Sequence, residues 1–300
     1  MGKCYVFPGQ GGQSVGMGKV LYDKNPMARA VFDEVDDALG EKLSDLIFNG
    51  PAEELNLTKN VQPAVFAVSM AMYLGWKASP DALGPPPPDF VAGHSLGEYS
   101  ALCAAGSVGV GAMARLLRKR GELMQDAAPS GVGAMAAIIG VGDVPAICAD
   151  AAAAGICEVA NDNSPGQTVI SGYSAAVEKA VELAKGRGAK IAKVLSVSVP
   201  AHSGLMRPAV EGIRAALDEI EWKSPICPLI SNKTAGVMTD TAEIKESLVY
   251  QLTHGVRWRE SVLNMPALGI DEVVEIGPGN VLTGLVKRIA PELNCYKLEL

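Results

Sequence analysis

Hydrophobic and polar residues alternate along the first 128 positions as short apolar runs separated by longer amphipathic segments. The runs at 4–7 and 90–93 are short and continuously apolar, which is typical of buried strands. The segments at 27–39 and 61–74 are long enough for helices and repeat their apolar positions at helical spacing. Strands that alternate with helices predict a parallel sheet covered by helices, and therefore an α/β fold.

After Pro129 the pattern changes to a compact β-α-β-β-α-β order. This order is typical of a ferredoxin-like unit. We therefore expect residues 129–197 to form a small inserted subdomain, with Pro129 and Pro200 near its two connections to the rest of the chain. The predicted elements are strand 133–139, helix 143–154, strands 156–160 and 167–171, helix 174–185 and strand 190–197.

The larger domain resumes after the insert, so we expect residues 1–128 and 198–300 to form one discontinuous α/β domain. A chain of 300 residues, 48% of them hydrophobic, can bury the core that this organisation requires. The expected elements are helix 207–220, strand 228–231, helices 242–252 and 258–268, strand 272–276 and helix 281–289.

The sequence Gly93-His94-Ser95-Leu96-Gly97 lies where a predicted strand, preceded by the proline run 85–88, meets a predicted helix. A sharp strand-to-helix turn needs glycine at 93 and 97, because a Cβ there would collide with neighbouring backbone, and it exposes the serine hydroxyl. The Ser95 and Leu96 amides would lie at the helix N-terminus, where they stabilise developing negative charge. The pattern favours a nucleophile elbow over a tight turn that merely contains serine.

Composition and charge narrow the classes of function. No run approaches the roughly 18 to 20 apolar residues of a membrane span, and a strand follows the first Met at once, so we expect neither a membrane segment nor a signal peptide. The six cysteines lack Cys-x-x-Cys spacing and there are three histidines, which disfavours a zinc site and indicates reduced thiols in the cytoplasm. A net charge of −7 disfavours nucleic acid as a partner.

A serine nucleophile needs a base that takes its proton, and three histidines are available. His94 adjoins Ser95, but neighbouring side chains in a strand or elbow point apart. His202 lies at the junction of the insert and the larger domain, a place that favours clefts. His254 follows a predicted helix, where histidine commonly caps the C-terminus. The spacing favours His202 and keeps His254 as the alternative.

Arg120 lies on the apolar face of a predicted helix over 113–124. A buried arginine must meet an anion, because an unpaired buried charge is strongly destabilising. One reading is an internal ion pair with an Asp or Glu. The other is the free carboxylate of a substrate, which a guanidinium binds through two parallel hydrogen bonds.

The sequence Phe7-Pro8-Gly9-Gln10-Gly11-Gly12-Gln13 follows the first predicted strand, where parallel-sheet proteins place ligand loops. It lacks the Gly-x-Gly-x-x-Gly spacing and the lysine of phosphate-binding loops. We expect it to bring the Gln10 amide beside Ser95 as the second donor of an oxyanion hole, a donor worth about 10² to 10³ in rate.

These motifs together resemble those of the malonyl-CoA:acyl carrier protein transacylases, in one order and over nearly the whole chain. The family fold, an α/β-hydrolase-like parallel-sheet core with a ferredoxin-like insert, agrees with the pattern of elements above. The matching stretches are FPGQG (7–11), GHSLGEY (93–99), RG (120–121), NSPGQ (163–167), SVPAH (198–202) and EIGPG (275–279).

The resemblance implies an acyltransferase that moves a malonyl group from malonyl-CoA to the phosphopantetheine thiol of acyl carrier protein, for fatty acid biosynthesis. Ser95 would be the acylated nucleophile, His202 its base and Arg120 the partner of the malonyl carboxylate. The transfer would be a ping-pong reaction through a malonyl-serine ester, and it would require neither a metal nor a bound cofactor.

Other positions of the family motifs can be carried over in the same way. The Gln10 and Leu96 amides would form the oxyanion hole, and the Gln251 main-chain carbonyl would orient the base. Asn161 and Asn163 would lie at the lip of the cleft.

One position departs from the family pattern. Ala201 stands where many members have serine before the base, near a position that affects which acyl group is accepted.

Three alternatives remain open at this stage. A related acyltransferase would load the carrier protein of a polyketide synthase. A serine esterase or thioesterase on the same elbow would use His254, because that class places its histidine nearer the C-terminus. A binding module for acyl-CoA or carrier protein would keep the fold without catalysis.

Carrier proteins are acidic, so a local basic patch must overcome the repulsion expected from the net charge of −7. We expect a monomer that binds its carrier through such a patch. The candidate residues are Arg115, Arg118 and Lys119 on the outer face of the Arg120 helix, Lys185, Arg187, Lys190 and Lys193 on the insert, and Lys287 and Arg288 near the C-terminus.

Overall fold

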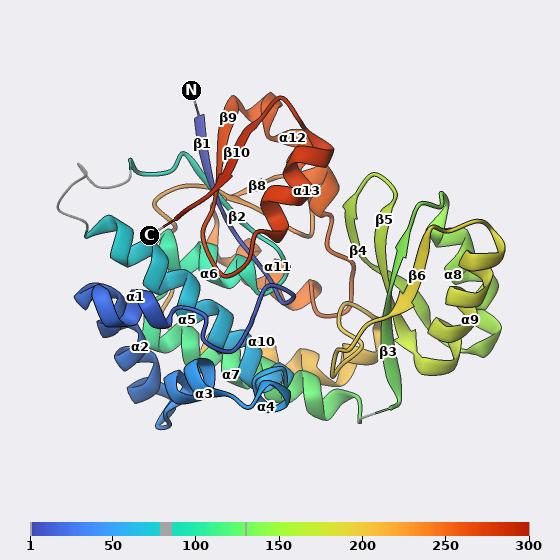
Figure 1. Ribbon diagram of the computed structural model, residues 1–300, viewed down its shortest axis with the longest axis horizontal. Helices are drawn as coiled ribbons and strands as arrows, with labels where there is room; N and C mark the ends of the chain where they lie inside the picture. Colours follow the sequence, from blue (N-terminus) through green and yellow to red (C-terminus); the bar gives the residue numbers. More distant parts are fainter. Residues whose placement is uncertain (1, 79–85, 130, 300) are drawn as a thin grey trace.

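The computed structural model describes residues 2–78, 86–129 and 131–299. Pro85, the first residue of the predicted proline run, lies outside the described residues. The described chain forms a mixed α/β fold with a mainly parallel sheet at its centre and a separate antiparallel sheet beside it (Figure 1).

The central sheet has the strand order β10-β9-β1-β2-β7-β8. Neighbouring strands are parallel except for β8, which pairs antiparallel with β7. The predicted parallel sheet is therefore confirmed. Its strands are β1 (Gly2–Phe7), β2 (Phe90–Gly93), β7 (Leu229–Ile230), β8 (Val237–Met238), β9 (Ile270–Glu275) and β10 (Asn294–Lys297).

Helices cover both faces of this sheet because successive side chains of a strand point to opposite sides. On β1, Tyr5 and Phe7 face one apolar core, whereas Cys4 and Val6 face another. The second core is closed by α12 (Trp258–Asn264), η3 (Pro266–Leu268) and α13 (Val281–Ile289). The first is closed by α1 (Lys19–Lys24), α2 (Pro26–Leu39), α3 (Leu43–Asn49), α4 (Ala52–Leu55), α5 (Thr58–Lys77), α6 (Gly97–Ala104), α7 (Val110–Ala127), η2 (Gly204–Ala209), α10 (Val210–Asp218) and α11 (Thr241–Tyr250).

A proline inside α5 frees one carbonyl of that helix. Pro63 has no N–H, so the Lys59 carbonyl cannot receive the usual helical hydrogen bond. Arg118 of α7 donates to this carbonyl from Nη1 at 2.8 Å. The contact ties α5 to α7, the helix that carries Arg120.

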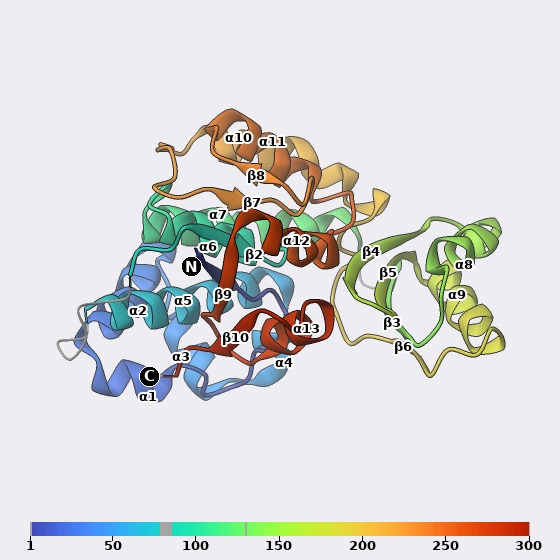
Figure 2. The same ribbon diagram turned by 90° about the horizontal axis from the view of Figure 1, so that it is seen from above.

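The antiparallel sheet has the order β4-β5-β3-β6, and it stands at one end of the molecule (Figure 2). Its elements follow the predicted β-α-β-β-α-β order, with α8 and α9 packed on the sheet around one apolar core. The elements are β3 (Gly133–Ile139), α8 (Val144–Ala151), η1 (Ala152–Ala154), β4 (Cys157–Ser164), β5 (Gln167–Tyr173), α9 (Ser174–Gly186) and β6 (Ile191–Val194).

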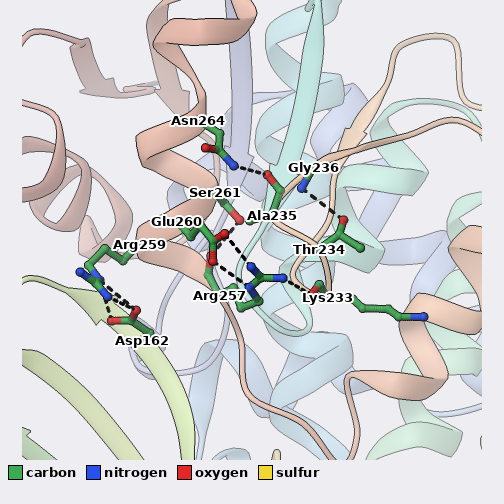
Figure 3. Close-up of polar contacts among 10 residues, drawn as sticks. All are labelled: Asp162, Lys233, Thr234, Ala235, Gly236, Arg257, Arg259, Glu260, Ser261 and Asn264. Atoms are coloured by element: carbon green, nitrogen blue, oxygen red, sulfur yellow. Dashed lines mark hydrogen bonds and ion pairs between the residues drawn. The ribbon is translucent and has the colours of Figure 1, made fainter. Parts of the chain in front are cut away.

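The strand β4 is hydrogen-bonded to a segment that lies outside both sheets. The Asp162 amide donates to the Val256 carbonyl at 3.0 Å, and the Val256 amide donates to the Ala160 carbonyl at 2.9 Å. An ion pair between Asp162 and Arg259 of α12 lies beside this bridge (Figure 3). The antiparallel sheet is thus joined to the segment that follows α11.

Several predicted boundaries were wrong. The expected helices 207–220 and 258–268 each divide into an α-helix and a 3₁₀ turn, and a proline lies in each turn, at 208 and 266. The expected strand 190–197 ends at Val194, whereas β4 continues past the expected end at 160 to Ser164. The sequence did not predict α1, α3, α4, β8 or β10.

None of the helices in the described ranges is both long enough and apolar enough to cross a membrane.

Candidate active site

Ser95 lies in the turn between β2 and α6, with a left-handed φ of 55°. The turn is possible because glycine stands on both sides of it. A Cβ at Gly93 would overlap the carbonyl carbon of Gly97, and a Cβ at Gly97 would overlap the Phe7 carbonyl oxygen. The predicted need for glycine at both positions is confirmed.

His202 is the histidine that the structure brings to Ser95. Its Nε2 lies 2.8 Å from Ser95 Oγ, and its Nδ1 lies 2.7 Å from the Gln251 main-chain oxygen. A carbonyl can only accept, so the proton is on Nδ1, and Nε2 is left to accept the serine proton. Burial, and then the positive charge of Arg120, lower the pKa of His202 to about 3, which keeps the imidazole neutral.

The other two histidines have different surroundings. His94 Nε2 lies 2.8 Å from Asn163 Oδ1 and does not contact the serine hydroxyl. His254 is exposed and stacks on Tyr250 with ring centres 3.6 Å apart. Its Nδ1 lies 3.0 Å from the Tyr250 carbonyl at the end of α11, as a C-terminal cap does.

Arg120 is 1% exposed and meets two glutamines rather than a carboxylate. Its Nη1 donates to Gln62 Oε1 at 2.5 Å, and its Nη2 donates to Gln251 Oε1 at 2.9 Å. The guanidinium also lies over the Tyr99 ring, 5.2 Å from its centre. Within the described ranges, Arg120 makes no ion pair and its Nε has no hydrogen-bond partner. The guanidinium therefore keeps donor capacity and contacts no carboxylate directly among the described residues.

The Gln10 and Leu96 amides, which are expected to form an oxyanion hole, differ from the Ser95 amide in whether the N–H is free to donate. The Ser95 N–H donates to Asn232 Oδ1 at 2.8 Å and is not available, contrary to the expectation for this amide. Among the described residues, the Gln10 and Leu96 amides have no hydrogen-bond acceptor. Gly9 allows the Gln10 loop to approach the turn, since a Cβ there would lie 2.6 Å from the His94 carbonyl oxygen.

Sequence analysis missed three buried polar side chains at the site, Gln62, Glu98 and Asn232. Asn232 holds the turn from both directions, because its Nδ2 also donates to the Gly93 carbonyl at 2.7 Å. Glu98 accepts from the Asn232 N–H at 2.7 Å. One sequence signal could have pointed to these buried polar residues. Glu98 is a carboxylate in the otherwise uncharged helix GEYSALCA.

The position of Asn232 depends on α12. The Arg257 amide donates to the Asn232 carbonyl at 3.2 Å, and Arg257 Nη1 donates to the Lys233 carbonyl at 3.1 Å. Further along the helix, Asn264 donates to the Ala235 carbonyl at 3.0 Å (Figure 3). The loop after β7 is thus bound along the side of α12.

A cavity of about 160 Å³ opens beside Ser95 and His202. Asn161 and Asn163 of β4 are buried in its wall rather than at an exposed lip. Much of the remaining lining is apolar and comes from the antiparallel sheet, the segment after β6 and α13: Met135, Val169, Leu195, Val197, Ala201, Val281, Leu282 and Leu285. A larger cavity of about 1190 Å³ lies between α5, α7 and α10 and is lined by neither Ser95 nor His202. Ser95 and His202 therefore mark the smaller cavity as the candidate reaction site.

The described ranges contain no group of three or more His, Cys, Asp or Glu side chains that could hold a metal ion.

Residues 4–294 match the family model described as the acyl transferase domain. The chain belongs to this family. It is 50% identical over 290 residues to the malonyl CoA-acyl carrier protein transacylase of Bacillus subtilis strain 168, covering 95% of this chain and 90% of that protein. The Escherichia coli K12 protein of the same name is 44% identical over 98% of this chain and 95% of its own length.

Solved structures of family members have the same fold. An acyl-carrier-protein S-malonyltransferase from Bartonella henselae superposes with a TM-score of 0.96 at 50% identity, covering 100% of this chain and 96% of that one. A malonyl-transacylase in complex with a type II polyketide synthase acyl carrier protein gives a TM-score of 0.95 at 42% identity, over 99% of this chain and 96% of that one. These structures share the parallel-sheet core and the separate antiparallel sheet.

Proposed function

We propose that this protein transfers a malonyl group from malonyl-CoA to the phosphopantetheine thiol of an acyl carrier protein, as an acyltransferase of fatty acid biosynthesis. The names of its relatives support the substrates. The observation that carries the proposal is the joint placement of Ser95, His202 and a buried arginine that, within the described ranges, contacts two glutamines and no carboxylate directly.

In the first half-reaction His202 takes the Ser95 proton on Nε2 as Oγ attacks the thioester carbonyl. The Gln251 carbonyl keeps the imidazole in the required tautomer and stabilises the imidazolium that forms. The tetrahedral oxyanion is held by the Gln10 and Leu96 amides. When it collapses, His202 returns the proton to the sulfur of the departing CoA, and malonyl remains as an ester on Ser95.

In the second half-reaction the carrier thiol gives its proton to His202 and attacks the ester by the reverse route. Arg120 binds the malonyl carboxylate in both halves and so fixes the position of the acyl carbonyl. The cavity of about 160 Å³ is below the roughly 300–1,000 Å³ of pockets for drug-sized ligands. It therefore suits an acyl group, while the rest of the thioester lies outside.

The scheme uses only side chains and main-chain amides of this protein, so we propose that no cofactor is bound. The turn at Ser95 between a parallel strand and a helix supports an α/β-hydrolase-like description of residues 1–128 and 198–300. The order of the antiparallel sheet supports a ferredoxin-like insert over residues 129–197. We further propose that the active unit is a monomer.

The carrier protein is acidic, and we propose that it binds along β6. Lys190 and Lys193 are exposed there beside Ile191 and Val194, which are also exposed. The same segment continues to Val197, which lines the cavity at Ser95. Of the other candidates for the basic patch, Arg118 pairs with Glu41, and Arg187 pairs with Asp150. Those two arginines have their charge largely satisfied within the protein.

A direct test is mass spectrometry of the intact protein after mixing with malonyl-CoA. We expect an adduct of malonyl mass that is lost in Ser95→Ala and removed by phosphopantetheinylated carrier protein. A wild-type protein without an adduct would indicate a binding module instead. Carrier proteins of fatty acid and polyketide synthesis are then compared as acceptors, since the polyketide carrier of one structural neighbour is the second candidate.

A further inference from the structure

Glu98 is a buried carboxylate that contacts two parts of the site. It lies in the first turn of α6 and is 0% exposed. Its Oε1 accepts from the Asn232 N–H at 2.7 Å, and its Oε2 accepts from Gln251 Nε2 at 2.5 Å. Burying a carboxylate is costly unless donors satisfy it. Here a donor satisfies each oxygen.

The Gln251 side-chain amide lies between Glu98 and Arg120 and has only one orientation that satisfies both. Arg120 can only donate, so Gln251 must present Oε1 to it. Gln251 Nε2 then faces Glu98, and it also lies 3.1 Å from the Ser95 carbonyl oxygen. A reversed amide would place its NH₂ against the guanidinium and its oxygen against the carboxylate.

The geometry favours the ionised form of Glu98. Both oxygens already accept N–H groups, and within the described ranges Glu98 has no further partner that would accept a carboxyl hydrogen. Burial raises the pKa of Glu98, while these two hydrogen bonds and the charge of Arg120 oppose that shift. Protonation would remove the acceptor that fixes the Gln251 amide.

We propose that Glu98 is a positioning residue. It fixes the orientation of the Gln251 amide, and through that amide the position of Arg120 relative to Ser95. This inference rests on the proposed function, because it assumes that Arg120 binds the malonyl carboxylate. Glu98 reaches the carboxylate-binding side through Gln251 and the nucleophile side through Asn232, which accepts the Ser95 N–H. The selection of a carboxylated acyl group is therefore coupled to the geometry of Ser95.

The first test is Glu98→Gln, which keeps the shape but places an NH₂ group against one of the two N–H donors. The readout is the ratio of the rates at which malonyl-CoA and acetyl-CoA acylate Ser95. We expect this ratio to fall about tenfold, equivalent to about 1.4 kcal/mol. The matched control is Asp36→Asn on α2, which also removes a buried carboxylate with two hydrogen bonds, to Ser44. We expect Asp36→Asn to leave the ratio unchanged.

A double-mutant cycle tests whether Glu98 acts on Arg120 through the Gln251 side chain. In Gln251→Met the amide is lost, so Glu98 can no longer act on Arg120, and we expect a comparable fall in the ratio. In the double variant Glu98→Gln with Gln251→Met, the ratio should fall no further than in Gln251→Met alone. If the two changes multiply, or if Glu98→Gln slows both acyl groups by the same factor, the inference is wrong.

The remaining outcomes keep this inference testable and separate it from the proposed function. If Glu98→Gln does not fold, Gln251→Met decides alone, and an unchanged ratio in that variant overturns the inference. If Arg120→Met lowers the ratio while Glu98→Gln does not, Arg120 binds the carboxylate without help from Glu98. If wild type is not acylated by malonyl-CoA at all, the proposed function itself fails.

Discussion

Replacing Arg120 by methionine removes a positive charge at a position that is 1% exposed and retains most of the side-chain volume. A charge-assisted hydrogen bond contributes about 1.5–3 kcal/mol. The loss of one such bond to the malonyl carboxylate therefore lowers the rate of malonyl loading roughly 10- to 150-fold. Acetyl has no carboxylate, so its loading loses nothing from this source, and the whole factor should be visible in the ratio of the two rates.

A structural cost accompanies the substitution. Arg120→Met leaves Gln62 Oε1 and Gln251 Oε1 without their donor, and each unsatisfied buried group costs about 1–3 kcal/mol. That cost lowers the free energy of unfolding, and so the amount of folded enzyme, equally for both acyl groups. The ratio is insensitive to it, which is why the ratio rather than the malonyl rate tests the role.

The assay follows acylation of Ser95 by malonyl-CoA and by acetyl-CoA in single-turnover experiments with intact-mass detection. Arg115→Met is the matched control, because Arg115 is exposed on the same helix. Its ratio should equal that of wild type. An Arg120→Met ratio within a factor of two of wild type would show that Arg120 has a structural role only, held by its two glutamines.

The remaining predictions concern the base, its titration and the carrier protein. His202→Ala should slow Ser95 acylation by a factor of about 10² to 10⁴, while the His254→Ala variant should be acylated at the wild-type rate. The reverse pattern would favour the esterase alternative. Since burial lowers the pKa of His202 to about 3, the base stays unprotonated as pH falls, and the rate of acetyl loading, which does not use the contacts among Glu98, Gln251 and Arg120, should be level from pH 8 to pH 5. A histidine with the ordinary pKa of about 6.5 would lose roughly 30-fold by pH 5, so such a loss would contradict the buried position. The double variant Lys190→Glu/Lys193→Glu should raise KM for the carrier protein and leave loading from malonyl-CoA unchanged. Lys24→Glu/Lys77→Glu, which makes the same charge change on α1 and α5, should alter neither; equal effects on both half-reactions would count against a basic patch on β6.

Sequence patterns predicted the long regular elements well. The expected bounds 133–139 and 281–289 coincide with β3 and α13, because both have clear apolar periodicity and defined ends. The missed helices α1, α3 and α4 have at most seven residues, too few to show a helical period. The divided helices fail at Pro208 and Pro266, which remove a main-chain donor.

Some residues of the candidate site have a local sequence signal, and others interact only over a long distance in the sequence. Ser95, His202 and Gln10 lie in loops with distinctive local sequence, so their positions could be proposed from the chain alone. Asn232 and Glu98 lie 134 residues apart and act through each other, and no local pattern records such a pairing. The mistaken expectation for the Ser95 amide has the same origin, because only the folded chain brings Asn232 to it.

The buried polar network explains how a strained turn is maintained. Ser95 and His202 both have a left-handed φ, of 55° and 60°, and a non-glycine residue in such a region costs of the order of 1–3 kcal/mol. Asn232 holds the Ser95 turn through the Ser95 N–H and the Gly93 carbonyl. Because that contact occupies the Ser95 amide, the oxyanion hole that we propose consists of the next amide, Leu96, and the amide of Gln10. The same side chain that stabilises the strained serine thus determines which amides remain free for the reaction.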